Sequence, residues 1–154
     1  MSANINSFGM LEGSEKPWWA SQQTVINTWS KDSLWEVVAE RSGLAWEAVF
    51  QSLQTISGKP INSHRAIVRT DTQEPISVVK SRYHIVQPKD SFKFFDEVIN
   101  GIQYHTAGSL GNGSKLWVLA KMSYQFEVVS GDKIENFVLL SNSFDGTTTL
   151  KIMF

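Results

Sequence analysis

The sequence predicts an α+β fold: an antiparallel sheet of several β-hairpins covered by two short amphipathic helices. Three observations predict it. Most of the chain alternates apolar and polar residues at a period of two, which is typical of half-buried strands. Short turns rich in Gly, Asp and Asn separate these stretches, so neighbouring strands are expected to pair antiparallel. Only two stretches show the helical spacing of apolar residues.

The N-terminus differs in composition from the rest of the chain. Residues 1–16 are rich in Ser, Asn and Gly and carry no period, so we predict a flexible N-terminal arm there. Residues 17–154 then form a single α+β domain. Adjacent side chains on a strand face opposite ways, so we expect at least one of Trp18 and Trp19 to pack on the domain.

The first helix is predicted within "SKDSLWEVVAERSG", residues 30–43. Ser33 and Glu36 have the spacing of a capping box, and Gly43 stands where a helix commonly ends in a left-handed residue. The apolar stripe is short, so we expect this helix to cover a sheet. It consists of Leu34, Val37 and Val38, with Arg41 at the same spacing.

From Trp46 onward the period becomes that of strands. One strand lies within residues 46–56 and ends at the breaker "SGKP". Residues 64–70 and 76–86 form a hairpin around the turn "DTQEP". Two further hairpins are centred on "GNG" at residues 111–113 and on "SGD" at residues 130–132.

The second helix is predicted within "QPKDSFKFFDEVING", residues 87–101. Asp90 can cap its N-terminus and Gly101 ends it. Its apolar stripe, which should face the sheet, consists of Phe92, Phe95, Val98 or Ile99, and Ile102.

The last two strands are predicted at residues 137–144 and 147–154. Asp145-Gly146 joins them as a type I′ turn, which needs positive φ values that Asp and Gly tolerate. Three apolar residues of the final strand share one face, and an apolar edge strand invites pairing. We therefore predict an interface, with a partner or with a second copy in a homo-oligomer, at Leu150, Ile152 and Phe154.

Composition and spacing offer little chemistry. The chain has 154 residues and no cysteine, which excludes disulfides and thiol nucleophiles and is consistent with a reducing cytoplasm, where we expect the protein. No apolar run approaches the roughly 20 residues that span a bilayer. The glycine-rich residues 108–114 lead into a strand, not a helix, which favours a hairpin turn over a phosphate site.

No catalytic residue, metal or cofactor is predicted. The three histidines (His64, His84 and His105) lie about twenty residues apart without metal-ligand spacing. Ser141, Asn142, Ser143 and Asp145 flank a turn with no histidine base placed beside them, and such residues are ordinary turn formers. We therefore expect a non-enzymatic protein.

A mildly basic segment is the remaining candidate site. Residues 64–93 hold six Lys and Arg against three Asp and Glu, whereas residues 1–54 hold three against six. Positive side chains with stacking rings on a sheet are typical of single-strand nucleic-acid binding, and a solvated outer face is the alternative. The predicted nucleic-acid contacts are Arg65, Arg69, Lys80, Arg82, Tyr83 and His84.

Four stretches carry a family resemblance. They are "SGLAWE", "YHIVQPKDSFKFFDEVI", "TAGSLGNGSKLWVLAKM" and "LLSNSFDGTTTLKI". Together they resemble a bacterial family of phage- and plasmid-borne proteins called domain of unknown function 932, over about Pro17 to Phe154. The chain departs from the family at "PWWASQ", where Pro-Trp-His-Gly is more frequent, and at Phe144, where histidine is common. Family members continue past this last hairpin, so the chain looks like an N-terminal half.

The resemblance implies a mobile-element setting, and therefore the cytoplasm of a bacterial host cell, without implying an activity. We expect a phage- or plasmid-associated protein that binds single-stranded DNA or RNA, for instance as a recombination accessory. The alternative is a protein-binding module, such as an inhibitor of a host defence or a phage assembly partner, because 12% of the residues are aromatic and aromatic residues anchor interfaces.

Overall fold

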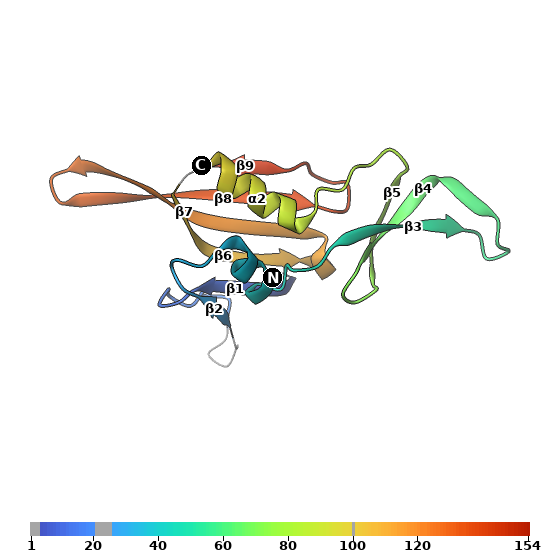
Figure 1. Ribbon diagram of the computed structural model, residues 1–154, viewed down its shortest axis with the longest axis horizontal. Helices are drawn as coiled ribbons and strands as arrows, with labels where there is room; N and C mark the ends of the chain where they lie inside the picture. Colours follow the sequence, from blue (N-terminus) through green and yellow to red (C-terminus); the bar gives the residue numbers. More distant parts are fainter. Residues whose placement is uncertain (1–3, 21–25, 100) are drawn as a thin grey trace.

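The structure is a computed structural model that describes residues 4–20, 26–99 and 101–154 (Figure 1). It contains two sheets and two α-helices, which confirms the predicted fold class. The larger sheet has six strands in the order β2-β1-β6-β7-β8-β9. Their bounds are β1 Ile5–Leu11, β2 Asn27–Trp29, β6 Ile102–Leu110, β7 Lys115–Val129, β8 Asp132–Ser143 and β9 Lys151–Met153. Only β1 and β2 pair in parallel.

The smaller sheet is an antiparallel meander of β3 (Ala48–Gln54), β4 (Pro60–Arg69) and β5 (Pro75–Lys80). It lies at one end of the long axis, and the ribbon of β7 and β8 projects at the other (Figure 1). The turn between β6 and β7 is the short 3₁₀ segment Gly111–Gly113, so the glycine-rich stretch is a hairpin turn as predicted.

Both helices cover the same face of the six-stranded sheet (Figure 1). They are α1 (Trp35–Arg41) and α2 (Pro88–Val98). The predicted stripe of α2 is confirmed by the burial of Phe92, Phe95 and Ile99, whereas Val98 is exposed. None of the helices in the described part of the chain is long and apolar enough to cross a membrane.

The predicted helix caps are only partly correct. Gly43 ends α1 with φ +74°, and the N–H groups of Gly43 and Leu44 donate to the carbonyls of Glu40 and Ala39, as in a Schellman motif. The predicted capping box is wrong. The N–H groups of Val37 and Val38 donate to the Leu34 carbonyl, so Leu34 holds the N-cap position and Ser33 lies outside the helix.

The predicted caps and stripes fail at four further positions. Leu34, Val37 and Arg41 are exposed, while Val38 and Ala39 are buried. In the second helix, Gln87 holds the N-cap position and Asp90 lies in the first turn, because the helix begins at Pro88.

The prediction of a flexible arm over residues 1–16 is wrong for residues 5–11. They form β1, which pairs with both β2 and β6. Gly9, one of the small residues that indicated flexibility, is required by packing instead. A Cβ on Gly9 would lie 2.6 Å from the Trp29 ring, so this strand needs a glycine where it passes the helix-covered core.

The predicted two-residue turn at Asp145-Gly146 is also wrong. β8 ends at Ser143 and β9 begins at Lys151, so a seven-residue loop joins them. Only Gly146 takes a positive φ there, whereas a type I′ turn needs two such residues. The Asp145 carboxylate instead accepts hydrogen bonds from the backbone N–H and the hydroxyl of Thr147, at 2.9 and 2.5 Å.

The three residues of the predicted C-terminal interface do not share one environment. Leu150 and Ile152 are partly buried against the core of the six-stranded sheet. Phe154 is 86% exposed. β9 is the edge strand of the sheet, so an interface there stays a prediction.

The loop after β8 joins the two sheets. The fully buried Phe144 ring lies 5.2 Å from the Trp46 ring, and its backbone N–H donates to the Ser114 carbonyl at 2.8 Å. From the smaller sheet, the Ser77 hydroxyl donates to the Phe144 carbonyl at 2.5 Å. This loop therefore helps to hold β3–β5 against the larger sheet, together with the hydrogen bond from Arg69 of β4 to the Asn112 carbonyl in the turn before β7.

Candidate functional site

The predicted basic cluster does not form one surface. Arg69 is 5% exposed and makes a two-bond ion pair with Asp71, at 2.9 Å (Nε–Oδ1) and 2.7 Å (Nη2–Oδ2). Its guanidinium also lies 4.6 Å from the centroid of the Trp46 ring. The hydrogen bond from Arg69 holds the pKa of Asp71 below its ordinary value. Arg69 therefore has a structural role and adds no free charge to the surface.

The other five predicted residues divide between two sides. Arg65 faces the body, where its guanidinium covers the Phe50 ring at 3.7 Å and donates to the Ser81 carbonyl at 2.5 Å. The Tyr83 hydroxyl donates to the Ser143 carbonyl at 3.0 Å. Only Lys80, Arg82 and His84 are exposed, and their contact with nucleic acid stays a prediction.

Metal-ligating geometry is not evident in the described residues. They contain no group of three His, Cys, Asp or Glu side chains that could hold an ion. The residues at the last turn that were predicted to be structural have hydrogen-bond partners, some of them distant in the sequence. The buried Asn142 donates to the Val86 carbonyl at 2.9 Å and to the Ser91 hydroxyl at 3.2 Å, and the Ser143 hydroxyl donates to the Thr148 carbonyl at 2.6 Å.

A second candidate lies on the face of the six-stranded sheet opposite the helices, which we call the aromatic face. The strand register places five residues in one row across this face, from β1 to β9. At about 4.8 Å per strand spacing, the row spans roughly 19 Å. Its members are Phe8, Gly108, Trp117, Ser141 and Lys151.

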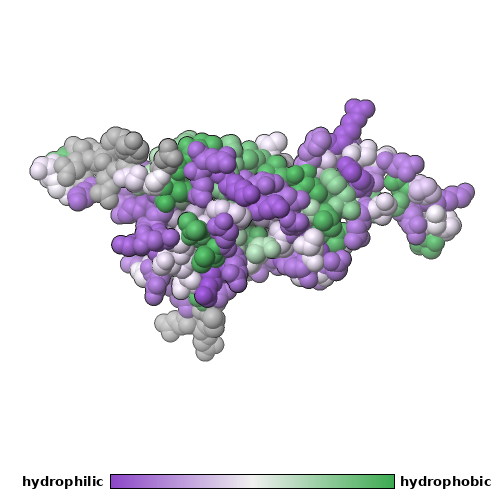
Figure 2. Space-filling view, viewed as in Figure 1, coloured by the Kyte–Doolittle hydropathy of each residue, from purple (hydrophilic) through white to green (hydrophobic). Residues whose placement is uncertain are grey.

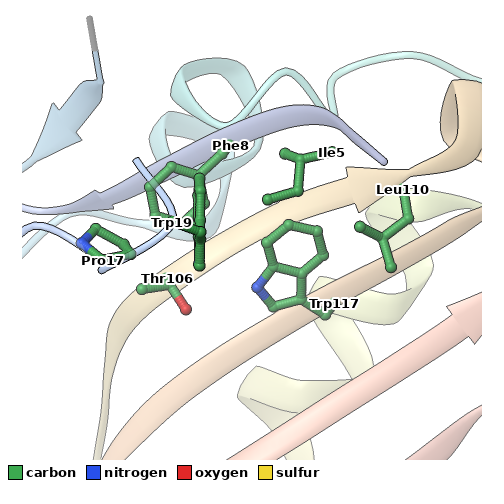
Figure 3. Close-up of a pocket in the computed structure, with 7 residues that line it drawn as sticks. All are labelled: Ile5, Phe8, Pro17, Trp19, Thr106, Leu110 and Trp117. Carbon is green, nitrogen blue, oxygen red and sulfur yellow. The ribbon is translucent and has the colours of Figure 1, made fainter. Parts of the chain in front are cut away.

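Aromatic rings form a pocket at the β1 end of this row (Figure 3). The Trp19 ring meets Phe8 edge-on at 4.9 Å, and the Phe8 and Trp117 rings lie within 24° of parallel at 6.2 Å. Trp18 is 93% exposed, so one tryptophan of the pair packs on the domain, as predicted. The pocket has a volume of about 300 Å³ and is lined by Ile5, Phe8, Pro17, Trp19, Thr106, Leu110 and Trp117.

Gly108 allows the Trp117 ring to lie across the sheet. A Cβ at Gly108 would be 2.5 Å from Cη2 of Trp117 and 2.3 Å from the Ser7 carbonyl oxygen. No side chain therefore stands between the two rings of the row, and the Trp117 ring occupies the space above the glycine. The Phe8 and Trp117 rings therefore lie side by side on this face, where a planar ligand can stack on a ring.

Lysines flank these rings. Lys115 and Lys121 share the face of Trp117 because side chains alternate along β7. Lys151 lies two strands from Trp117 in the same row. The Lys121 ammonium is paired with the Glu135 carboxylate, while Lys115 and Lys151 are exposed. The aromatic face thus combines apolar rings with a small excess of positive charge.

His105 lies beside the segment that brings Trp19 to the pocket. Its Nε2 is 3.5 Å from the Ser14 hydroxyl, and its ring meets Phe137 edge-on at 5.4 Å. Its Nδ1 is buried and finds no hydrogen-bond partner among the described residues. Desolvation lowers the pKa of His105 below its ordinary value of 6.5, Lys121 lowers it further, and Glu135 opposes the shift.

This lowered pKa predicts a pH-dependent stability. Well above pH 6.5 the His105 imidazole is neutral in both the folded and the unfolded chain, so its protonation does not reduce the free energy of unfolding. As the pH falls below 6.5 the unfolded chain takes up the proton first, so the free energy of unfolding decreases. In urea denaturation, the free energy of unfolding should decrease less between pH 7.5 and pH 5.5 for His105→Gln than for the parent protein. The exposed His84→Gln is the control, and an equal loss in all three proteins would contradict this prediction.

The sequence prediction missed the aromatic face. The hairpin that contains Gly108 and Trp117 was predicted, and β1 was not. Lys115, Trp117 and Lys121 lie on one side of the predicted strand, and this pattern was visible in the sequence. Without β1, however, no second aromatic residue was predicted beside Trp117. A strand prediction over residues 5–11 would have offered Phe8 as a strand residue, but its position opposite Gly108 comes from the register that the structure shows.

Comparison with known proteins yields one family. The sequence model of the family described as Domain of unknown function (DUF932) matches residues 75–154. This is the C-terminal half of the chain, so the match is shorter than the predicted range of Pro17 to Phe154. It includes Trp117 and Lys151 of the aromatic face but not Phe8. Neither the curated proteins nor the solved structures contain a match.

Proposed function

The chain belongs to the DUF932 family, a domain of unknown function, and from the aromatic face we propose that it binds single-stranded nucleic acid. The row from Phe8 to Lys151 is the observation that carries the proposal. Proteins that bind single strands combine sheet-borne rings, on which unpaired bases stack, with cations that contact the phosphates. In the phage and plasmid setting that the resemblance implies, such binding would serve recombination.

The shape and chemistry of the pocket support a base as the stacked group. Its volume of about 300 Å³ is at the small end of ligand pockets, and most of its lining residues are apolar. The Thr106 hydroxyl supplies a polar group at one wall (Figure 3). Bases in a duplex are already stacked on their neighbours, so a surface that depends on ring stacking favours single strands.

The charge of the protein supports a binding mode in which stacking dominates. The net charge is −1, and only three lysines flank the rings, one of them already paired. For two or three phosphate contacts on a single strand, the logarithm of the binding constant should fall with the logarithm of salt with a slope of roughly −1.4 to −2.1. A purely electrostatic binder would show a steeper slope.

The proposal is tested by titration with oligonucleotides of about a dozen nucleotides. Oligodeoxythymidine should quench the tryptophan fluorescence, and the binding constant obtained from this titration should depend on salt with the slope given above. An abasic strand of the same length keeps the phosphates but lacks the bases, so it should bind more weakly, as should a duplex. Absence of binding at low salt, or equal affinity for the abasic strand, would contradict the proposal.

A further inference from the structure

The exposed side of α1 carries an apolar pair that no described element covers. Leu34 is 70% exposed and Val37 is 41% exposed. Figure 2 shows hydrophobic residues enclosed by hydrophilic ones where this helix lies. Glu36 and Glu40 flank the pair, and both are exposed. We call these four residues the helix surface.

The outward side of the three-stranded sheet carries a second apolar pair. Val78 is 58% exposed and Val49 is 37% exposed. Lys80 follows Val78 on the same side of β5, with His64 as its neighbour on β4. No carboxylate of β3, β4 or β5 is among them, since these strands contain none. We call these four residues the strand surface.

We propose that copies of this chain associate head to tail, with the helix surface of one copy packed on the strand surface of the next. Each surface combines two exposed aliphatic side chains with charged neighbours, which are Glu36 and Glu40 on the helix surface and Lys80 on the strand surface. Asp32 and Arg82 add to the acidic and basic charge, while Lys31 and Arg41, the last residue of α1, reduce the contrast. Apolar contact would supply the affinity, and the charges would select the partner surface.

These charges are available for an intermolecular contact. In the part of the chain that the structure describes, the ion pairs are Arg69–Asp71, Lys89–Glu47 and Lys121–Glu135. Glu36, Glu40 and Lys80 are in none of them. Opposite surfaces on one chain favour a second copy as the occupant.

A contact between two different surfaces leaves one of each unused at the ends of every assembly. Such heterologous contacts continue into rings or filaments, unlike the two-fold contact of a simple dimer. The mass in solution should therefore exceed 17.3 kDa and rise with concentration. The aromatic face lies on other residues, so this inference does not depend on nucleic-acid binding.

The test uses two variants, each of which removes one surface. Leu34→Lys with Val37→Lys places cations on the helix surface, and Val78→Glu with Lys80→Glu places anions on the strand surface. Each variant alone should stay at 17.3 kDa by light scattering after gel filtration. Mixed in equal amounts, they should form a 1:1 complex of twice that mass, because each retains the surface that the other lacks.

Three results would overturn the proposal. They are a parent protein that stays at 17.3 kDa at every concentration, a single variant that still associates, or a mixture that stays monomeric. Circular dichroism verifies that the variants fold. If either does not, Glu36→Lys with Glu40→Lys and Lys80→Glu with Arg82→Glu change only exposed charged residues and make the same comparison.

Discussion

Replacing Phe144 with alanine will lower the free energy of unfolding by about 3–5 kcal/mol, the cost typical of removing a fully buried phenylalanine. The ring is fully buried against Trp46, at the loop that joins the two sheets. Its loss leaves a cavity on the larger sheet and loosens the contact through which Ser77 holds the smaller one. Urea denaturation followed by tryptophan fluorescence measures the change, and Trp46, one of the six tryptophans, is in contact with the Phe144 ring.

Phe154→Ala is the matched control for this prediction. It removes the same ring from a residue that is 86% exposed, so the free energy of unfolding should change by no more than about 0.5 kcal/mol. If Phe144→Ala cost no more than this control, the joint between the sheets would not depend on the Phe144 ring.

Replacing Trp117 with alanine will weaken the binding of oligodeoxythymidine by roughly 5- to 150-fold, which corresponds to about 1–3 kcal/mol for one lost base stack. Trp117 is the central residue of the row and forms one wall of the pocket. Since the lysines remain, the salt dependence should keep its slope while the affinity falls at every salt concentration. Fluorescence anisotropy of a labelled oligonucleotide measures both quantities.

Trp18→Ala is the control for this second prediction, because Trp18 is almost fully exposed and does not line the pocket. It should bind as the parent does, whereas Trp19→Ala should lose affinity. Equal losses in the variants of the two neighbouring tryptophans would place the binding site elsewhere. Trp117→Phe, which retains a ring, should recover part of the affinity lost by Trp117→Ala.

Turns and helices of this chain were predictable because their signals are local. Gly43 ends the first helix since a positive φ is required there, and the residues around it are adjacent in the sequence. The spacing of Phe92 and Phe95 was sufficient to orient the second helix. The turn prediction failed where the same local sequence is compatible with two different loops. Asp145-Gly146 is typical of a two-residue turn, but the loop around it extends to hold Phe144 in the core.

The basic residues show a similar limit. Arg65, Arg69 and Lys80 looked alike in the sequence, yet a guanidinium can be enclosed by a carboxylate and a ring while a neighbouring ammonium stays in water. Arg69 reaches Asp71 two residues along the chain, but its burial depends on Trp46 and on the turn before β7. Burial of this kind depends on segments distant in the sequence, so charge counting could not find it.

Trp117 and Val118 show where prediction from the sequence ends for this protein. Alternation along β7 was enough to show that these neighbours face opposite sides of a sheet. It could not show which side is covered. Both helices dock on the side of Val118, which is fully buried, and Trp117 is left on the open side with Phe8 from the other end of the chain. Strand periodicity is a property of neighbouring residues, whereas the choice of the covered face depends on long-range packing.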